Sequence, residues 1–271
     1  MSTLTLIKTE LKNAINKKFI FYYVMLTVIP FFYFFINYNN YIFRDSLDVF
    51  TFMFEGIIPM LFIFILVVFY LGSFSRTIDN SFIVYSRMRA PVEKILISSF
   101  FCNIIISFLV FFTFTFNMFV FAFLIEPFFS FITFMPEVYN LDASSVILDS
   151  YTRHTFTNLL AINAITFGLL YSFWVGLHAV LYATIGFFMV ILLDKQLLAL
   201  ISPILLYIIG TFTTGLFPSL LPFRPLDVIF PFNIAQQPFW TSLVSMAFLL
   251  LICIILLLYT INKKNSLENL M

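Results

Sequence analysis

The chain has 271 residues and a net charge of +1; 62% of its residues are hydrophobic and only 10% are charged. Soluble domains average about 25% charged residues, and a soluble fold of this length could not hide so much apolar surface. The near-zero net charge gives no reason to expect a nucleic-acid partner. Because a backbone in lipid must satisfy its own hydrogen bonds, long apolar runs form helices there. The composition therefore predicts an all-α polytopic membrane protein, with residues 1–271 forming one transmembrane domain.

Residues 1–18 are predicted to form an element that precedes the first span. Leu4, Ile7, Leu11 and Ile15 recur at helical spacing, while the lysines fall on other faces. This pattern is typical of an amphipathic helix lying at a membrane interface, and a frayed tail is the alternative. No small-residue cleavage site follows the first apolar stretch, so we expect that stretch to remain as a membrane anchor.

Six apolar stretches are long enough for a helix to cross a bilayer, which takes about 20 residues. The predicted spans are residues 19–38, 50–71, 95 to at least 116, a fourth that ends at 193, 197–217 and 240–261. The apolar runs at 95–135 and 156–193 exceed one crossing, so each forms either a long tilted helix or a span with an interfacial extension. For the second run, the polar residues between 155 and 166 favour an interfacial helix.

The lysines and arginines predict the orientation of the chain. If the N-terminus is placed inside, eleven of these residues fall inside and three outside. The inside set is Lys8, Lys12, Lys17, Lys18, Arg76, Arg87, Arg89, Lys94, Lys195, Lys263 and Lys264, and the outside set is Arg44, Arg153 and Arg224. The positive-inside rule therefore predicts cytoplasmic N- and C-termini. Abundant Phe, Ile, Asn and Lys indicate an AT-rich bacterial genome, and we expect the chain in the bacterial plasma membrane.

A polar segment, residues 73–94, separates the second span from the third on the expected cytoplasmic side. Ile78, Phe82 and Tyr85 fall at i, i+4 and i+7 and form one apolar face of a short predicted helix that ends before Pro91. Such a face suits docking of a soluble partner, and packing on lipid headgroups is the alternative. The predicted docking residues are Ile78, Asp79, Phe82, Tyr85, Arg87 and Met88.

Two connections on the expected outer side have unusual compositions. Residues 126–155 form a predicted extracellular loop that is acidic, with Arg153 as its only formal cation. Residues 218–239 carry five prolines among Phe, Leu and Ile, so this segment is too apolar for a solvent loop and too rich in proline for one helix. We expect it to form a re-entrant or surface-lying hairpin between spans five and six.

The sequence carries no pattern for catalysis or for binding a cofactor or metal. It lacks the glycine-rich loop that cradles nucleotide phosphates. His154 and His178 have no carboxylate or cysteine at ligand spacing, and Cys102 and Cys253 lie in apolar stretches. We therefore expect no catalytic, cofactor-binding or metal-binding residues, and the chain is not predicted to be an enzyme.

Glu55 and His178 are the polar residues predicted to line a translocation path. Glu55 lies near the outer end of the predicted second span, where an interfacial carboxylate is the alternative. Its spacing from Pro59 predicts a kink in that helix. His178 lies within the fourth span and either faces a polar cavity or is neutral and hydrogen-bonded between helices.

Three short segments carry a resemblance to a known family. Asp79, residues 80–84 (Asn-Ser-Phe-Ile-Val) and residues 91–95 (Pro-Val-Glu-Lys-Ile) are similar in order and spacing to the cytoplasmic loop of permeases of the ATP-binding-cassette (ABC) transporter superfamily, type-2 exporter class. Residues 194–196 (Asp-Lys-Gln) resemble the polar turn that follows the fourth span in that family. The family's Gly-Thr is missing, and Phe101 stands where a lysine is often found.

The resemblance covers the full length and implies a membrane-spanning subunit of a bacterial ABC transporter. Such a subunit would export amphipathic or hydrophobic cargo, such as a peptide, a toxin or a lipid-linked glycan. It would work as a homo- or heterodimer, in contact with membrane lipid, and a separate ATPase subunit would bind the docking residues. A membrane-embedded enzyme or an assembly protein without an ATPase partner is the alternative.

Overall fold

The computed structural model describes residues 2–56, 58–79 and 91–263. Within these ranges the fold is helical and contains no strand, and six helical segments are long and apolar enough to cross a membrane. The six segments are α2 (Lys17–Asn37) with η1 (Tyr38–Asn40); α4 (Ile58–Leu66) with the π-helical turn η2 (Val67–Leu71) and α5 (Gly72–Asp79); α7 (Val92–Val120) with the π-helical turn η3 (Phe121–Ile125) and α8 (Glu126–Phe129); α10 (Ala164–Leu192); α11 (Gln196–Gly215); and α13 (Phe239–Asn262). The predicted all-α fold with six spans is confirmed.

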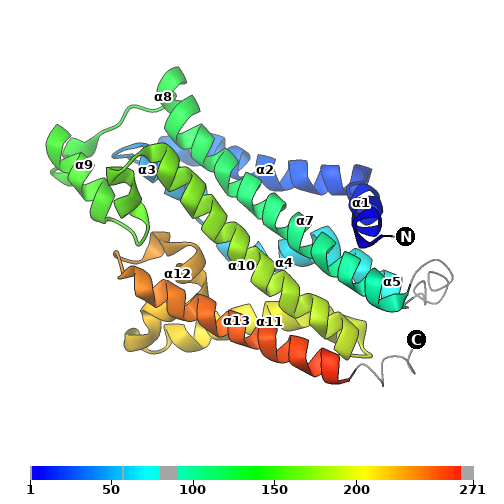
Figure 1. The fold of residues 1–271 in the computed structure, drawn as a ribbon. Coiled ribbons are helices and arrows are strands. Elements are labelled where there is room, and N and C mark those ends of the chain that lie inside the picture. Colours follow the sequence, from blue (N-terminus) through cyan, green and yellow to red (C-terminus); the bar gives the residue numbers. More distant parts are fainter. Residues whose placement is uncertain (1, 57, 80–90, 264–271) are drawn as a thin grey trace.

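Helix α10 forms the centre of the bundle (Figure 1). In its most apolar 18-residue window 72% of the residues are buried, against 17% for α2 and 11% for α13. Helix α7 packs along α10, and Gly176 permits the close approach, because a Cβ at this position would lie 2.9 Å from the ring of Phe108. Helices α2 and α13 therefore present most of their apolar surface outward, as spans that face lipid do.

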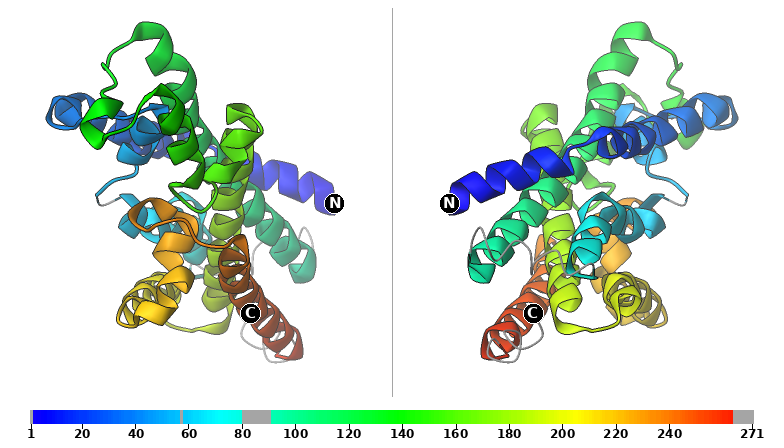
Figure 2. Two further views of the ribbon diagram at one scale, coloured as in Figure 1. Left: turned by 90° about the vertical axis from the view of Figure 1, so that its left-hand side faces the viewer. Right: turned by 90° about the vertical axis from the view of Figure 1, so that its right-hand side faces the viewer.

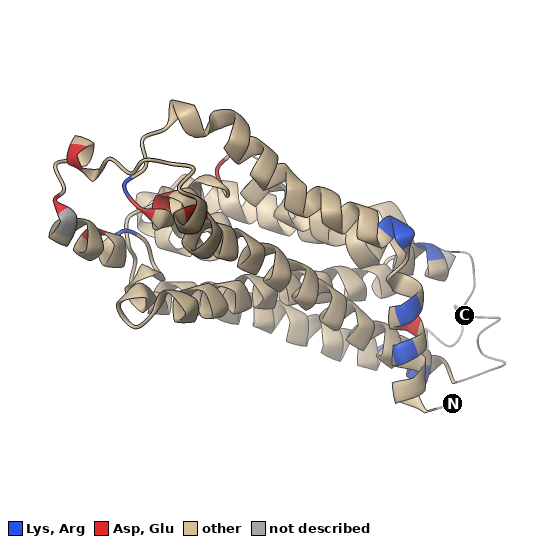
Figure 3. Ribbon diagram, turned by 90° about the horizontal axis from the view of Figure 1, so that it is seen from above, with Lys and Arg blue, Asp and Glu red and all other residues tan. Residues whose placement is uncertain are grey.

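The charged residues separate between the two ends of the bundle (Figure 3). One end carries the start of α1, the end of α13 and most of the lysines, and we call it the basic end. Lys17 and Lys18 begin α2 there, and Lys94 and Lys195 lie at the starts of α7 and α11. The opposite end, which we call the acidic end, carries most of the aspartates and glutamates, together with Arg44, Arg153 and Arg224. Both described chain ends thus lie at the basic end.

The N-terminal segment forms helix α1 (Thr3–Ala14), which crosses the first turns of α7 instead of continuing into α2 (Figures 1 and 2). Its first turn is capped by Ser2, whose hydroxyl accepts from the Thr5 amide at 3.3 Å. Asn16 caps the next helix in the same way, accepting from the amides of Lys18 and Phe19. The Asn16 cap lies at the turn between α1 and the first span, and the helix predicted within residues 1–18 is present.

The predicted loop 126–155 and the outer part of the predicted second span fold together at the acidic end. The elements there are α3 (Ser46–Phe52), η4 (Pro136–Tyr139), α9 (Ala143–Thr152) and η5 (Thr157–Ala161). Arg153 pairs with Asp45 at 2.9 Å, with Asp48 at 2.7 Å and with Asp149, and Arg44 pairs with Asp48 at 2.8 Å. Burial opposes the charge of Arg153, but its hydrogen bonds and ion pairs with these aspartates outweigh burial and raise its pKa. These ion pairs join α3 to α9 across more than 100 residues of sequence.

The structure corrects the start of the second span. We predicted that this span begins at residue 50, but α3 ends at Phe52 and α4 begins at Ile58. Gly56 lies in the break with φ +77°, a left-handed backbone conformation that residues other than glycine rarely adopt. It changes the direction of the chain there. Glu55 therefore lies between two helices and not within a span. The kink predicted at Pro59 is absent, because Pro59 occupies the first turn of α4, where proline is tolerated.

The two long apolar runs have different outcomes. The run at 95–135 forms one helical span, residues Val92–Phe129, which matches the long-helix alternative. In the run at 156–193, the expected interfacial helix is a short 3₁₀ segment, η5. Asn163 then caps α10, because its side chain accepts from the Ile165 amide at 2.8 Å.

Candidate functional site: a cavity between α10, α11 and α13

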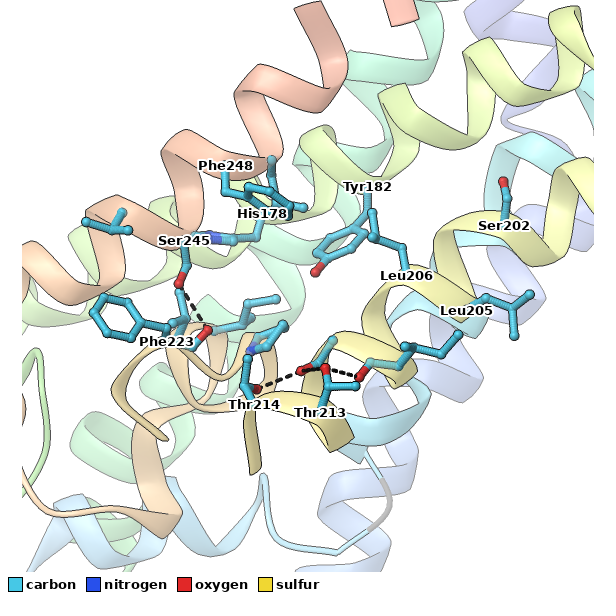
Figure 4. Close-up of a pocket in the computed structure, with 17 residues that line it drawn as sticks. His178, Tyr182, Ser202, Leu205, Leu206, Thr213, Thr214, Phe223, Ser245 and Phe248 are labelled. Carbon is cyan, nitrogen blue, oxygen red and sulfur yellow. Dashed lines mark hydrogen bonds between the residues drawn. The ribbon is translucent and has the colours of Figure 1, made fainter. Parts of the chain in front are cut away.

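A cavity of about 730 Å³ lies between the central helix α10 and the two last spans, α11 and α13 (Figure 4). Its wall is mostly apolar, with a small number of polar side chains on each helix. The polar side chains that line it are His178 and Tyr182 of α10, Ser202, Thr213 and Thr214 of α11, and Ser245 of α13. An apolar cavity with few polar groups is the usual form of a small-molecule site.

His178, predicted from the sequence to line a translocation path, forms part of this wall. It is 1% exposed, and its Nδ1 lies 3.0 Å from the Trp174 carbonyl oxygen one turn earlier. A carbonyl oxygen only accepts, so Nδ1 carries the proton, and in the neutral ring Nε2 is a hydrogen-bond acceptor. Nε2 is buried and has no hydrogen-bond partner within the described part of the chain.

Three hydroxyl groups of the wall, those of Thr213, Thr214 and Ser245, are hydrogen-bond acceptors. Thr213 donates to the Ile209 carbonyl at 2.7 Å, Thr214 donates to the Gly210 carbonyl at 2.6 Å, and Ser245 donates to the Phe223 carbonyl at 3.1 Å (Figure 4). Each hydroxyl has a single proton, and that proton is already used in the hydrogen bond to the backbone carbonyl. The oxygen lone pairs that remain can only accept hydrogen bonds from a bound molecule.

The proline-rich segment closes the cavity towards the acidic end. It contains η6 (Pro218–Phe223), α12 (Pro225–Ile229) and η7 (Pro231–Asn233). The Trp174 indole donates to the Val228 carbonyl at 2.9 Å, and the Tyr171 hydroxyl donates to the Ile229 carbonyl at 2.8 Å. Trp174 lies ten residues after the start of α10, which is about 15 Å along a helix. The segment therefore packs against the middle of α10, while its form as a re-entrant or surface-lying hairpin stays a prediction.

A buried ion pair lies at the base of this segment. Asp227 is 2% exposed, and its carboxylate accepts from Arg224 at 2.8 Å. Burial raises the pKa of Asp227, and the Arg224 charge opposes that shift. The pair holds the first turn of α12 to the end of η6.

The other predicted site residues lie elsewhere. Glu55 is not among the residues that line the cavity, so the structure does not bring it together with His178. Burial, together with the charge of Asp48, raises the pKa of Glu55 in the break between α3 and α4. Ile78 packs against the core near the end of α5, and Asp79 is the last residue of that helix. The predicted docking residues Phe82, Tyr85, Arg87 and Met88 lie outside the described residues.

At the basic end, Glu10 is a residue that the sequence analysis missed. Its carboxylate accepts from the Tyr70 hydroxyl at 2.6 Å, from the Ser98 hydroxyl at 2.7 Å and from the Ser99 hydroxyl at 2.6 Å. It thereby joins α1 to the second span and to α7. One feature of the sequence pointed to Glu10: it directly precedes Leu11 and so lies at the edge of the apolar face of α1.

The comparisons with protein-family models, with curated proteins and with solved structures found no match for this chain. The class of protein is therefore defined by the fold: a multi-pass helical membrane protein with six candidate spans in the described ranges.

Proposed function

We propose that the chain is the membrane-spanning subunit of a bacterial ABC transporter, exporting amphipathic or hydrophobic cargo with ATP hydrolysed by a separate subunit. The observation that carries this proposal is the set of contacts at the basic end. Helices α5 and α7 flank residues 80–90, and Glu10 ties α1 to Tyr70 and to Ser98 in the two spans that contain these helices. Ser75 of α5 also donates to the Gln196 side chain of α11 at 2.8 Å.

These contacts are suited to a region of the membrane subunit on which a soluble partner exerts force. A push on residues 80–90 would act on α5 and α7 together, and both belong to spans that reach the acidic end. Because helices transmit displacement as nearly rigid rods, the motion would reach the outer elements. The proline-rich segment beside the cavity would then act as the outer gate.

The orientation that this function needs follows from charge. On the positive-inside rule, the basic end, which carries both described chain ends, would lie in the cytoplasm. The cytoplasm holds the ATP, and the sequence lacks a phosphate-binding loop, so the ATPase would be a separate chain. We also propose that two permease copies, identical or different, pair in the bacterial plasma membrane.

Phe82→Glu combined with Tyr85→Glu tests the proposed ATPase docking. Two carboxylates on the apolar face would oppose docking, so the tagged variant should lose an ATPase that co-purifies with the wild-type chain. Membrane insertion should be unchanged, as measured by the amount of chain in the membrane fraction.

The matched control is Ile147→Glu combined with Leu148→Glu, on exposed side chains of α9 at the acidic end. This control should retain the ATPase. Retention of the ATPase by the Phe82/Tyr85 variant would show that docking does not use that face.

A further inference from the structure

We propose that the cavity between α10, α11 and α13 binds a neutral, largely apolar molecule that carries a hydrogen-bond donor, of the kind found in a long-chain alcohol or an N-alkyl amide. As a statement about cargo this inference rests on the proposed function. As a statement about binding it stands alone, because the cavity lies within one chain and needs no ATPase.

The size and lining of the cavity favour an apolar body. A volume of about 730 Å³ lies in the range of drug-sized sites. Leu205, Leu206 and Ile209 of α11 face Val244 and Phe248 of α13 across it. Among the described residues that line it there is no Lys, Arg, Asp or Glu, so neither an anion nor a cation would find a counter-charge from them.

The polar groups of the wall favour a donor on the ligand. The wall hydroxyls of Thr213, Thr214 and Ser245 donate their hydrogen bonds to backbone carbonyls. The buried Nε2 of His178 also accepts, and the described part of the chain supplies it with no donor. A buried acceptor without a donor is unfavourable, and a ligand O–H or N–H that reaches Nε2 as the neighbouring side chains adjust would satisfy it. A carboxylate could accept from the Tyr182 hydroxyl, but it would set its lone pairs against those of the other wall groups and would bury a charge with no counter-charge.

The rim shows how such a molecule would enter. Ile209 is 55% exposed, Val244 is 49% exposed and Phe248 is 59% exposed, and all three line the cavity from spans that face outward. The opening between α11 and α13 thus lies on the surface that faces lipid. A molecule dissolved in the bilayer can enter the cavity there without crossing water.

Photolabelling of the purified full-length chain in phosphatidylcholine nanodiscs tests this inference. The probes are a long-chain alcohol with a diazirine in the chain and the carboxylate with the same chain and diazirine, and labelled residues are located by mass spectrometry. The alcohol should label the cavity residues of α10, α11 and α13 more strongly than the carboxylate does. An unlabelled alcohol should compete for these positions.

Variants identify the acceptor. His178→Phe should reduce labelling of the cavity by the alcohol about fivefold or more, because the ligand donor loses its partner. His178→Gln, which keeps an acceptor, should restore most of the labelling. His154→Phe is the matched control, because it removes the other histidine, which is outside the cavity. Val244→Phe fills the rim and should reduce labelling even with His178 in place.

Several results would overturn the inference. Equal cavity labelling by the alcohol and the carboxylate would show that the cavity does not prefer a ligand with a hydrogen-bond donor. Labelling unaffected by His178→Phe would show that His178 is not the acceptor. Labelling spread evenly over all lipid-facing helices would indicate ordinary lipid tails. A cavity that stays unlabelled because a second copy covers α11 and α13 would also contradict the inference. Since no nucleotide is added, binding can succeed even if the proposed transport function fails.

Discussion

At the residue scale, a few polar groups join helices that are otherwise held by apolar contact. Glu10 illustrates this, because its carboxylate accepts from hydroxyls on two different spans. The sequence predicted the apolar face of α1 but not this role. Nothing in the spacing of one acid shows that Tyr70, Ser98 and Ser99 will meet it, because these residues come together only through tertiary packing.

Glu10→Gln should loosen α1 from the bundle. The amide keeps the size of the side chain but loses the charge that strengthens hydrogen bonds from the hydroxyls, at a cost of about 1–3 kcal/mol. Amide hydrogen exchange within α1 should become faster, while exchange in α10 should not change. Lys8→Gln, on an exposed position of the same helix, is the control and should leave exchange as in the wild type. Unchanged exchange in Glu10→Gln would show that the cluster does not hold α1.

His154 should make the acidic end sensitive to acid. Burial lowers its pKa, and the Arg153 charge adds to that, against an opposing hydrogen bond with the Ile234 carbonyl. Since its folded pKa lies below the ordinary 6.5, the unfolded state binds a proton first as the pH falls. The stabilising contribution is therefore complete above about pH 6.5 and decreases below it.

Thermal unfolding in detergent, measured between about pH 7.5 and pH 5.5, checks this. The wild-type chain should lose more stability over this interval than His154→Gln does. An equal loss in both chains would assign the acid sensitivity to other groups.

At the element scale, the second span and the proline-rich segment differ in how well the sequence predicts them. Hydropathy located the six spans because lipid demands about 20 apolar residues for each one. It misplaced the start of the second span because Phe50, Phe52 and Phe54 are as apolar as lipid-facing residues but are buried against other rings at the acidic end. The turn that separates them from α4 depends on one glycine conformation, at Gly56.

Trp174→Phe should loosen the proline-rich segment from α10. The ring is retained, but the Val228 carbonyl loses its donor, which costs about 1–3 kcal/mol when the acceptor stays buried. In a background without Cys102 and Cys253, a cysteine at Val228 should react faster with a water-soluble maleimide once Trp174 is changed. Trp240→Phe is the control, because Trp240 is 57% exposed and is the other tryptophan. Equal reaction rates in the two variants would contradict the role of this hydrogen bond.

At the scale of the whole molecule, charge separates the two ends, and this pattern could be read from the sequence. The cavity could not, because it is formed by side chains from α10, α11 and α13 whose facing positions depend on helix packing. The sequence singled out His178 only because a histidine is uncommon within a span. Its role in moving cargo stays a prediction.

Single-cysteine labelling should give the orientation. In a background without the two buried cysteines, Asp142→Cys at the acidic end should react with an impermeant maleimide in intact cells. Lys195→Cys at the basic end should react only after the membrane is opened. Reaction of Lys195→Cys in intact cells would reverse the proposed orientation and place residues 80–90 away from ATP.

Purification of the tagged chain from its native membrane tests the central claim most directly. The measurement is the amount of ABC ATPase per chain together with the rate of ATP hydrolysis. A transporter subunit should retain the ATPase in a fixed ratio and hydrolyse ATP as a complex. A chain that purifies alone, with no nucleotide-dependent activity, would contradict the proposal and favour a membrane enzyme or an assembly protein.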